Sequence, residues 1–218
     1  MVEAVIFDLD GVLVDSETLW DDARRAVVAA HDGSWLKTAT RDMLGMSSRE
    51  WSAYMHDRLQ VPLEPERISA EVAGIVAAEY AETLPWLPGA RDAVERLATT
   101  WPLGLASSAN RTVIERFLDA SGLRTRFAVT VSSEEVARGK PAPDVYLAAA
   151  AGLEVEARAC VAVEDSGNGI RAGVAAAMAV IAVPNKHFPP TDADVALAAR
   201  VLPDLESLTA EQVESAHS

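Results

Sequence analysis

The stretch AVIFDLDG, residues 4–11 of the 218-residue chain, joins a fully apolar run to two acidic residues and a glycine. A short apolar run without polar alternation indicates a strand that is buried on both faces, as in a parallel sheet. Residues two apart in an extended chain point to the same side, so Asp8 and Asp10 are expected to converge at the carboxyl end of this strand. In open α/β sheets that edge is where ligands bind.

Comparable apolar runs recur along the chain, at residues 103–106, 128–131, 159–163 and 179–183. Stripes of apolar residues with helical spacing separate them. Gly122 and Gly152 are expected to end two of these helices, and Ser166 to cap the start of another. Strands and helices that alternate in this way predict an α/β fold with a doubly wound, Rossmann-like parallel sheet.

One long segment interrupts this alternation. Between Ser16 and Leu84 the sequence carries helical patterns and no convincing strand. Pro85, Pro88 and Gly89 then mark a return to the alternating pattern. We therefore predict an α/β core made of residues 1–15 and 86–218, with an all-helical cap domain inserted at residues 16–85.

The charge and cysteine content exclude several classes of protein. With 33 acidic and 19 basic side chains the formal net charge is −14, which opposes binding to nucleic acid. The single cysteine, Cys160, lies in an apolar run, so core packing and a reducing compartment are expected. The N-terminus has no signal-peptide pattern, and no apolar stretch is long enough to span a bilayer. These features favour a cytoplasmic protein without membrane partners.

Two pairs of carboxylates follow predicted strands. Asp8 and Asp10 form the first pair, and Glu164 and Asp165 form the second, directly after the run at 159–163. Neighbouring carboxylates repel each other and need a proton or a cation between them, and hard oxygen ligands suit Mg²⁺. The alternatives are solvated loop carboxylates at the first pair and helix capping at the second. The glycines after Asp165 miss the spacing of a dinucleotide-binding loop.

Hydroxyl and ammonium groups follow other strands of the predicted sheet. Ser107 ends one strand and precedes a helix, although Ser and Asn are also ordinary helix caps. Lys140 lies in the loop RGKPAPD at 138–144, where a glycine and two prolines restrict the backbone. An ammonium held in such a loop could neutralise a phosphate. The alternative is a solvated loop lysine. Strand ends of a parallel sheet meet at one edge, so acids, hydroxyl and lysine should share one crevice. Phosphoryl transfer requires such a set, because it depends on positioning and charge neutralisation.

In this order the residues resemble the haloacid dehalogenase-like hydrolases. The run FDLDGVLVDS at 7–16 resembles the first motif of that family, Ser107 the second, Lys140 the third, and Glu164-Asp165 the fourth. The resemblance extends over nearly the whole chain. The helical insert resembles the C1 cap of the branch that contains phosphatases and β-phosphoglucomutase.

The resemblance implies a role for each core residue. Asp8 would attack phosphorus to form an aspartyl-phosphate, and Asp10 would protonate the leaving oxygen and then activate water. The metal ligands for Mg²⁺ would be the Asp8 carboxylate, the backbone carbonyl of Asp10 and Asp165, with Glu164 bound directly or through water. Ser107 and Lys140 would hold the phosphoryl oxygens. The second acid, Asp10, argues against haloacid dehalogenase activity.

Substrate choice is expected to come from the cap and from the residues after Ser107. Arg49, in a cap loop that resembles the family's substrate loop, could grip an anionic or hydroxylated group, or it could be solvated. Glu17 could face the pocket, and Trp20 could line it, with packing between cap and core as the alternative for the tryptophan. Ser108 and Asn110 are the remaining candidates for substrate binding.

The sequence favours hydrolysis over isomerisation. A β-phosphoglucomutase has a histidine shortly after the first motif, where this chain has Trp20, and the histidines at 31, 56, 187 and 217 do not replace it by position. We therefore expect a Mg²⁺-dependent phosphatase that hydrolyses a small phosphorylated metabolite such as a sugar phosphate, as a monomer or weak dimer. The alternatives are a phosphosugar mutase and a non-catalytic receiver module phosphorylated on Asp8.

Overall fold

The computed structural model describes residues 1–186 and 188–217. Within these residues, six parallel strands form one sheet in the order β3-β2-β1-β4-β5-β6. The strands have the bounds β1 Ala4–Phe7, β2 Leu103–Ser107, β3 Phe127–Ser132, β4 Cys160–Glu164, β5 Ala179–Ala182 and β6 Arg200–Val201. The predicted α/β fold with a doubly wound parallel sheet is thus confirmed. The edge strand β6 escaped prediction because it is only two residues long and both residues are exposed.

Alternate residues of β1 pack into two separate hydrophobic layers, one on each face of the sheet. Val5 and Phe7 join one buried cluster, whereas Ala4 and Ile6 join the other. The first layer is covered by α5 (Ala90–Leu97), α6 (Arg111–Ser121) and α10 (Ala210–Ala216). The second layer is covered by α7 (Asp144–Gly152) and α8 (Gly167–Ala175). All four residues of β1 are therefore buried, as its apolar sequence predicts.

The strand order places a switch point beside β1. The chain builds outward from β1 through β2 to β3, then returns to the other side of β1 with β4. At such a reversal the loops after the two adjacent strands diverge and leave a crevice at their carboxyl ends. Asp8 follows β1 and Asp165 follows β4, so both lie at this crevice.

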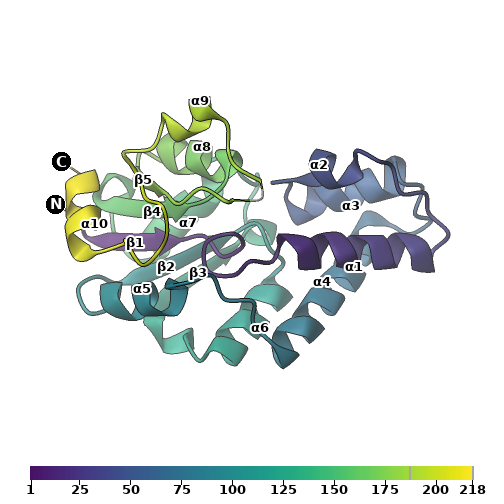
Figure 1. The fold of residues 1–218 in the computed structure, drawn as a ribbon, viewed down its shortest axis with the longest axis horizontal. Helices are drawn as coiled ribbons and strands as arrows, with labels where there is room; N and C mark the ends of the chain where they lie inside the picture. Colours follow the sequence, from purple (N-terminus) through teal and green to yellow (C-terminus); the bar gives the residue numbers. More distant parts are fainter. Residues whose placement is uncertain (187, 218) are drawn as a thin grey trace.

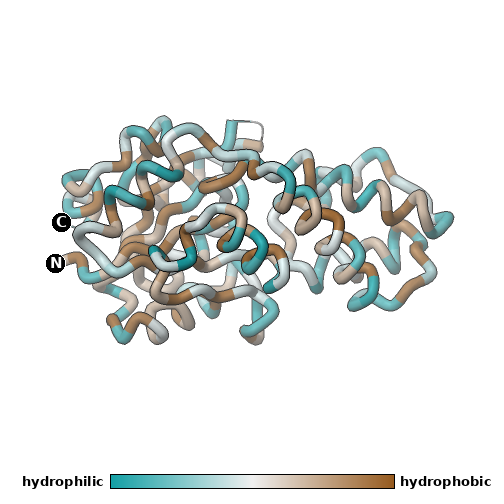
Figure 2. Tube along the Cα trace, turned by 90° about the horizontal axis from the view of Figure 1, so that it is seen from below, coloured by the Kyte–Doolittle hydropathy of each residue, from teal (hydrophilic) through white to brown (hydrophobic). Residues whose placement is uncertain are grey.

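Four helices occupy the long interruption of the alternating pattern: α1 (Glu17–Ala30), α2 (Ala39–Met43), α3 (Ser48–Asp57) and α4 (Pro65–Glu82). Figure 1 shows them beside the sheet, at the end opposite the two termini. Figure 2 shows hydrophobic and hydrophilic stretches alternating along them, as expected of helices with one buried face. We infer that residues 16–85 act as a cap domain on the α/β core.

The two connections between the helices and the sheet run side by side. Val14 and Trp86 form an antiparallel bridge, and the backbone N–H of Asp15 donates to the carbonyl of Pro85 over 2.8 Å. The Leu87 N–H donates to the Leu13 carbonyl over 3.1 Å. Paired connections of this kind hold the entry and the exit of the helical segment at one place, next to the carboxyl end of β1.

The three predicted helix boundaries are confirmed. Gly122 ends α6 in the left-handed conformation, with φ 70°. The Ser166 hydroxyl accepts a hydrogen bond from the Gly169 N–H at the start of α8. Gly152 is the last residue of α7, so this helix ends where it was expected to end. Its missing side chain is explained by packing, because a Cβ would lie 2.8 Å from the Val129 side chain.

Candidate active site

A cavity of about 490 Å³ lies between the carboxyl ends of β1 and β4 and the helices α1 and α3. Core and cap both contribute polar side chains to it. The core residues include Asp8, Asp10, Ser108, Lys140 and Asp165. The cap residues include Glu17, Trp20, Arg24 and Trp51. The cavity therefore brings together most of the residues that the sequence analysis singled out.

Lys140 lies between two carboxylates at the floor of this cavity. Its Nζ is 2.9 Å from Oδ1 of Asp8 and 2.6 Å from Oε1 of Glu164, and it donates to the carbonyl of Ala106 over 3.0 Å. All three charged side chains are buried. The alternative of a solvated loop lysine is thus excluded, because this ammonium makes three short contacts and has almost no access to water.

Burial and mutual repulsion dominate the ionisation of this cluster. Burial, with help from Glu164 and Asp10, raises the pKa of Asp8 to about 7 against the opposing effect of Lys140. Burial also raises the pKa of Asp165 well above its ordinary value, and Glu164 and Asp8 add to that rise. Burial alone would lower the pKa of Lys140, but Asp8 and Glu164 outweigh it and raise that pKa. The cluster therefore holds an excess of negative charge that one lysine does not neutralise.

Both oxygens of Glu164 have hydrogen-bond partners within the protein. Oε1 accepts from Lys140 and from the hydroxyl of Tyr146, over 2.8 Å for the tyrosine, and Oε2 accepts from the Asp165 N–H over 3.1 Å. A Cβ at residue 169 would lie 1.8 Å from Oε1 of Glu164, so glycine is required there. Tyr146 was not predicted from the sequence, because a tyrosine in an apolar helix is expected to pack in the hydrophobic core.

Three carboxylates offer oxygens suited to a hard cation. One oxygen each from Asp8, Glu164 and Asp165 lies within 4.8 Å of the others. Oδ1 of Asp165 is buried and has no hydrogen-bond partner among the described residues, while its Oδ2 accepts from Asn185 over 3.3 Å. A Cβ at Gly11, where φ is 81°, would lie 2.0 Å from Oδ2 of Asp165. Oδ1 of Asp165 is thus available as a ligand, and the neighbouring carboxylates add negative charge. Both features suit the binding of Mg²⁺.

Asp10 is oriented by residues from the inserted helices. Its Oδ1 accepts hydrogen bonds from Ser16 over 2.5 Å, from the indole N–H of Trp20 over 2.9 Å and from Tyr80 of α4 over 3.4 Å. The carboxyl group is absent from the group of three that could hold a metal. Strand alternation does not explain its position, contrary to the expectation, because β1 ends at Phe7 and residues 11–13 form a turn.

Ser107 is buried at the end of β2, next to the acidic residues. Its hydroxyl lies 3.5 Å from Oδ2 of Asp10 and accepts from the Ala109 N–H over 3.0 Å. Ser108, the next residue, lines the cavity. This pair therefore borders the place where a phosphoryl group would meet Asp8 and Lys140.

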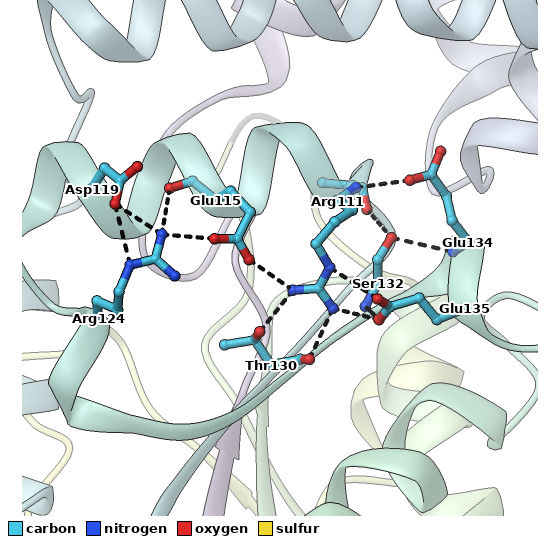
Figure 3. A network of polar contacts seen from close by, with 9 residues as sticks. Arg111, Glu115, Asp119, Arg124, Thr130, Ser132, Glu134 and Glu135 are labelled. Carbon is cyan, nitrogen blue, oxygen red and sulfur yellow. Dashed lines mark hydrogen bonds and ion pairs between the residues drawn. The ribbon is translucent and has the colours of Figure 1, made fainter.

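Asn110 and Arg49 are not brought to the cavity. The Asn110 amide donates to Oγ of Ser69 over 2.8 Å and to Oε1 of Glu134 over 2.7 Å. Arg49 reaches the backbone carbonyl of Glu134 over 3.4 Å. Figure 3 shows Glu134 beside the N–H of Arg111, in a network of polar residues around the start of α6. Both expected substrate contacts therefore join cap and core to each other instead.

Arg24 is the cap residue that the sequence analysis missed. Its side chain lies over the rings of Trp20 and Trp51, at 5.6 Å and 5.3 Å from their centroids, on the wall of the cavity. The residue is only 7% exposed. Its position four residues after Trp20, on the same face of α1, was the available signal.

The described histidines do not line the cavity. His31 pairs with Glu71 over 2.7 Å, His56 contacts the carbonyl of Leu63 over 2.8 Å, and His217 contacts the carbonyl of Arg158 over 2.7 Å. His187 lies outside the described residues. At the position expected to distinguish a mutase, the structure thus has the indole of Trp20 against Asp10.

Residues 2–177 match the family of haloacid dehalogenase-like hydrolases. Hexitol phosphatase B of Escherichia coli K12 is 37% identical over 193 residues, which cover 83% of each chain. A phosphorylated carbohydrates phosphatase of Thermotoga maritima is 33% identical over 177 residues, covering 80% of this chain and 82% of that protein. The chain therefore belongs to the haloacid dehalogenase-like hydrolases.

Solved structures agree with this assignment. CbbY from Rhodobacter sphaeroides, in complex with phosphate, has a TM-score of 0.88 at 27% identity and covers 98% of this chain and 100% of its own. β-Phosphoglucomutase from Clostridium difficile has a TM-score of 0.84, but at 23% identity it shows the shared fold alone. With phosphatases among its relatives, the chain is an enzyme of the phosphoric monoester hydrolase type. In the part of the chain that the structure describes, no helix is both long and apolar enough to cross a membrane.

Proposed function

We propose that this enzyme is a Mg²⁺-dependent phosphatase that hydrolyses a sugar or polyol monophosphate through an aspartyl-phosphate on Asp8. The observation that carries the proposal is the contact of the Asp8 carboxylate with Lys140 over 2.9 Å, with Asp10 and the Asp165 carboxylate on the same cavity. Relatives named as phosphatases of hexitols and of phosphorylated carbohydrates support the substrate class. The single, buried Cys160 supports a reducing, cytoplasmic location.

In the first step, a carboxylate oxygen of Asp8 attacks phosphorus and the bond from phosphorus to the ester oxygen breaks. Asp10 gives its proton to that leaving oxygen, so the product departs as a neutral alcohol. Lys140 and the hydroxyl of Ser107 are placed to donate hydrogen bonds to the phosphoryl oxygens as negative charge shifts onto them. Asp10 is suited to the proton transfer because three donors, from Ser16, Trp20 and Tyr80, fix its orientation.

In the second step, water attacks phosphorus of the aspartyl-phosphate and gives its proton to Asp10. The bond from phosphorus to the Asp8 oxygen breaks, which releases phosphate and restores both carboxyl groups. Trp20 and Trp51 contribute apolar rings to the wall of the cavity beside this place. Each residue thus returns to its starting state after one turnover.

Asp8, Asp165 and the backbone carbonyl of Asp10 would hold Mg²⁺, which supplies positive charge against the phosphoryl oxygens. Glu164 has partners on both of its carboxylate oxygens, so we propose that it acts through a bound water and mainly positions Lys140. The buried, unpartnered Oδ1 of Asp165 supports this choice of ligands.

The competing function is a phosphosugar mutase that uses the same nucleophile. The presence of Trp20 where a mutase has a histidine supports hydrolysis. The test is to incubate the enzyme with hexose and hexitol phosphates, with and without Mg²⁺, and to measure free phosphate and sugar isomers together. We expect Mg²⁺-dependent release of phosphate. Conversion of β-glucose 1-phosphate to glucose 6-phosphate with little free phosphate would establish the mutase instead.

A further inference from the structure

Arg24 is a buried cation that lacks a hydrogen-bond partner within the described chain. Its Nε is buried with no partner among the described residues, and its guanidinium lies over the rings of Trp20 and Trp51. Leaving a buried guanidinium without acceptors is costly, and this cost is recovered only if something else supplies the acceptors. Because Arg24 lies on the wall of the active-site cavity, a bound substrate can supply them.

The two tryptophans fix the direction in which Arg24 donates. A guanidinium over indole rings keeps its plane and loses little further freedom when it binds. Trp20 and Trp51 pack against each other with ring centroids 6.1 Å apart, and Trp20 is itself anchored by its hydrogen bond to Asp10. The donors of Arg24 are therefore held in a preformed position relative to the catalytic acid.

Glu17 places a carboxylate on the same cavity wall, about two helical turns before Arg24 on α1. Burial raises the pKa of Glu17, whereas the charge of Arg24 opposes that rise. The wall thus offers donors and acceptors side by side with a net charge near zero. Hydroxyl groups match such a pair, since each hydroxyl can accept from the guanidinium and donate to the carboxylate.

A second phosphate would not match this wall. Among the described residues, the other basic side chains on the cavity already have acidic or amide partners: Lys140 contacts Asp8 and Glu164, and Arg171 contacts Asp194 and Asn168. A dianionic group at the cap would therefore meet one positive charge and the negative charge of Glu17. The balance of charges selects against bisphosphates at this end of the cavity.

We propose that Arg24, held by Trp20 and Trp51 and acting with Glu17, is the specificity-determining residue that binds hydroxyl groups at the unphosphorylated end of the substrate. It makes the enzyme selective for polyhydroxylated monophosphates over bisphosphates and over esters that lack hydroxyl groups. The inference deepens the proposed phosphatase function and rests on it for the position of the phosphate.

The test compares Arg24→Met with the wild-type enzyme on three kinds of ester: a panel of hexose and hexitol 6-phosphates, fructose 1,6-bisphosphate, and phenyl phosphate. Loss of hydrogen bonds to a charged group predicts that kcat/KM for the best monophosphate of the panel falls about 10- to 100-fold. For phenyl phosphate, which offers no hydroxyl groups, we expect a change of less than about threefold. The wild-type enzyme should prefer the best monophosphate to the bisphosphate by at least about tenfold.

Arg25→Met is the matched control, because it removes the same charge from the next residue of α1. Arg25 is exposed, pairs with Asp21 and does not line the cavity. Its loss should change kcat/KM for every ester by less than about twofold. Thermal melts of both variants show whether they fold, and Arg24→Lys, which keeps the charge without the planar fork, should recover only part of the loss.

Equal losses on the monophosphate and on phenyl phosphate, in a folded Arg24→Met enzyme, would overturn the inference, as would a wild-type preference for the bisphosphate. Binding separates this outcome from failure of the proposed function. Sorbitol 6-phosphate is titrated into the Asp8→Asn protein, and binding is measured by calorimetry. The affinity should be lower in the double variant that also carries Arg24→Met. If the wild-type enzyme hydrolyses none of the esters while binding to the Asp8→Asn protein depends on Arg24, the inference is sustained and the phosphatase function is rejected. Binding that is indifferent to Arg24 would reject the inference.

Discussion

The indole N–H of Trp20 donates a hydrogen bond to Oδ1 of Asp10 over 2.9 Å, which joins the first inserted helix to the acidic residue beside the sheet. The same carboxylate oxygen accepts from Ser16 and from Tyr80 of α4. The residue proposed to transfer the proton is therefore oriented by the segment that covers the cavity. Catalysis should then depend on cap residues that touch no phosphoryl group.

Trp20→Phe tests this relationship, because it removes the indole donor and keeps an aromatic ring against Arg24. We expect kcat to fall about tenfold, since the hydrogen bond to the Asp10 carboxyl group is lost and Asp10 gains freedom to turn. The melting temperature should change little. Trp101→Phe is the control: it also deletes an indole hydrogen bond, to the Val2 carbonyl over 3.2 Å, but far from the cavity. An equal loss of kcat in both variants would contradict the proposed coupling.

Asp8→Asn removes the nucleophile while keeping the shape of the side chain. We expect kcat to fall by at least about 10³-fold, because the amide cannot form the phosphorylated intermediate. The fold should survive, since burial already disfavours the charged form of this carboxyl group and raises its pKa to about 7. Phosphate release and a thermal melt measure the two effects. Mg²⁺-dependent turnover retained by the variant would remove Asp8 from the role of nucleophile.

Asp165→Asn should stabilise the metal-free enzyme and inactivate it. The pKa of Asp165 is raised in the folded state, chiefly by burial, so ionisation of this group opposes folding at every pH above its unfolded pKa of about 4. The variant avoids that cost, and we expect a gain on the order of 1 kcal/mol at pH 7 that shrinks as the pH falls toward 4. Urea unfolding with EDTA at both pH values gives the comparison.

Magnesium should reverse the order of stability of these two proteins. A ligand at 100 times its Kd stabilises the folded state by about 2.7 kcal/mol, and this gain should be confined to the wild-type protein. A Mg²⁺-induced rise in melting temperature that is the same in Asp165→Asn would place the cation elsewhere.

Cys160 should resist alkylation in the folded enzyme. Burial, with a smaller effect from Glu3, raises the pKa of its thiol to about 11, so at pH 8 only about 0.1% would be thiolate. The side chain is also inaccessible within β4. We expect iodoacetamide at pH 8 to label it only after unfolding, as measured by mass spectrometry. Rapid labelling of the native protein would show that the start of β4 opens locally.

The sequence was sufficient to predict strands β1 to β5 because each contains a short apolar run, and in β1, β2 and β4 every residue is buried. The exposed edge strand β6 was missed. It also predicted that Asp8, Ser107 and Asp165 lie at strand ends on one edge of the sheet, since parallel strands bring their carboxyl ends together. Lys140 reaches the same edge from the loop between β3 and α7. Those predictions depend on local patterns alone. The structure adds how the charges are paired, in particular the placing of Lys140 between Asp8 and Glu164.

The cap was harder to predict, because its residues acquire their roles through contacts between distant segments. Arg49 and Asn110 looked suited to substrate binding, yet both donate hydrogen bonds to Glu134. In sequence, Glu134 lies 24 residues from Asn110 and 85 residues from Arg49. Arg24 was not singled out in the sequence, because the two tryptophans against which it packs lie on different helices. The hydrogen-bond partner of a polar side chain depends on which residues the fold brings near it. The spacing of residues along the sequence does not give that information.

Gly169→Ala should inactivate the enzyme although residue 169 does not line the cavity. An added Cβ would lie 1.8 Å from Oε1 of Glu164, so that carboxylate must move, and Lys140 and Tyr146 lose their shared acceptor. We expect a loss of stability of about 1–3 kcal/mol from overpacking, and a fall in kcat of at least about tenfold as Lys140 leaves its position.

Gly74→Ala, on the exposed face of α4 with open space around its Cα, is the matched control. It should raise stability by about 0.5–1 kcal/mol, because alanine favours the helix, and leave kcat unchanged. Denaturant unfolding and phosphate release distinguish the two variants. A Gly169→Ala enzyme with normal kcat would show that the Glu164 contact with Lys140 is dispensable for turnover.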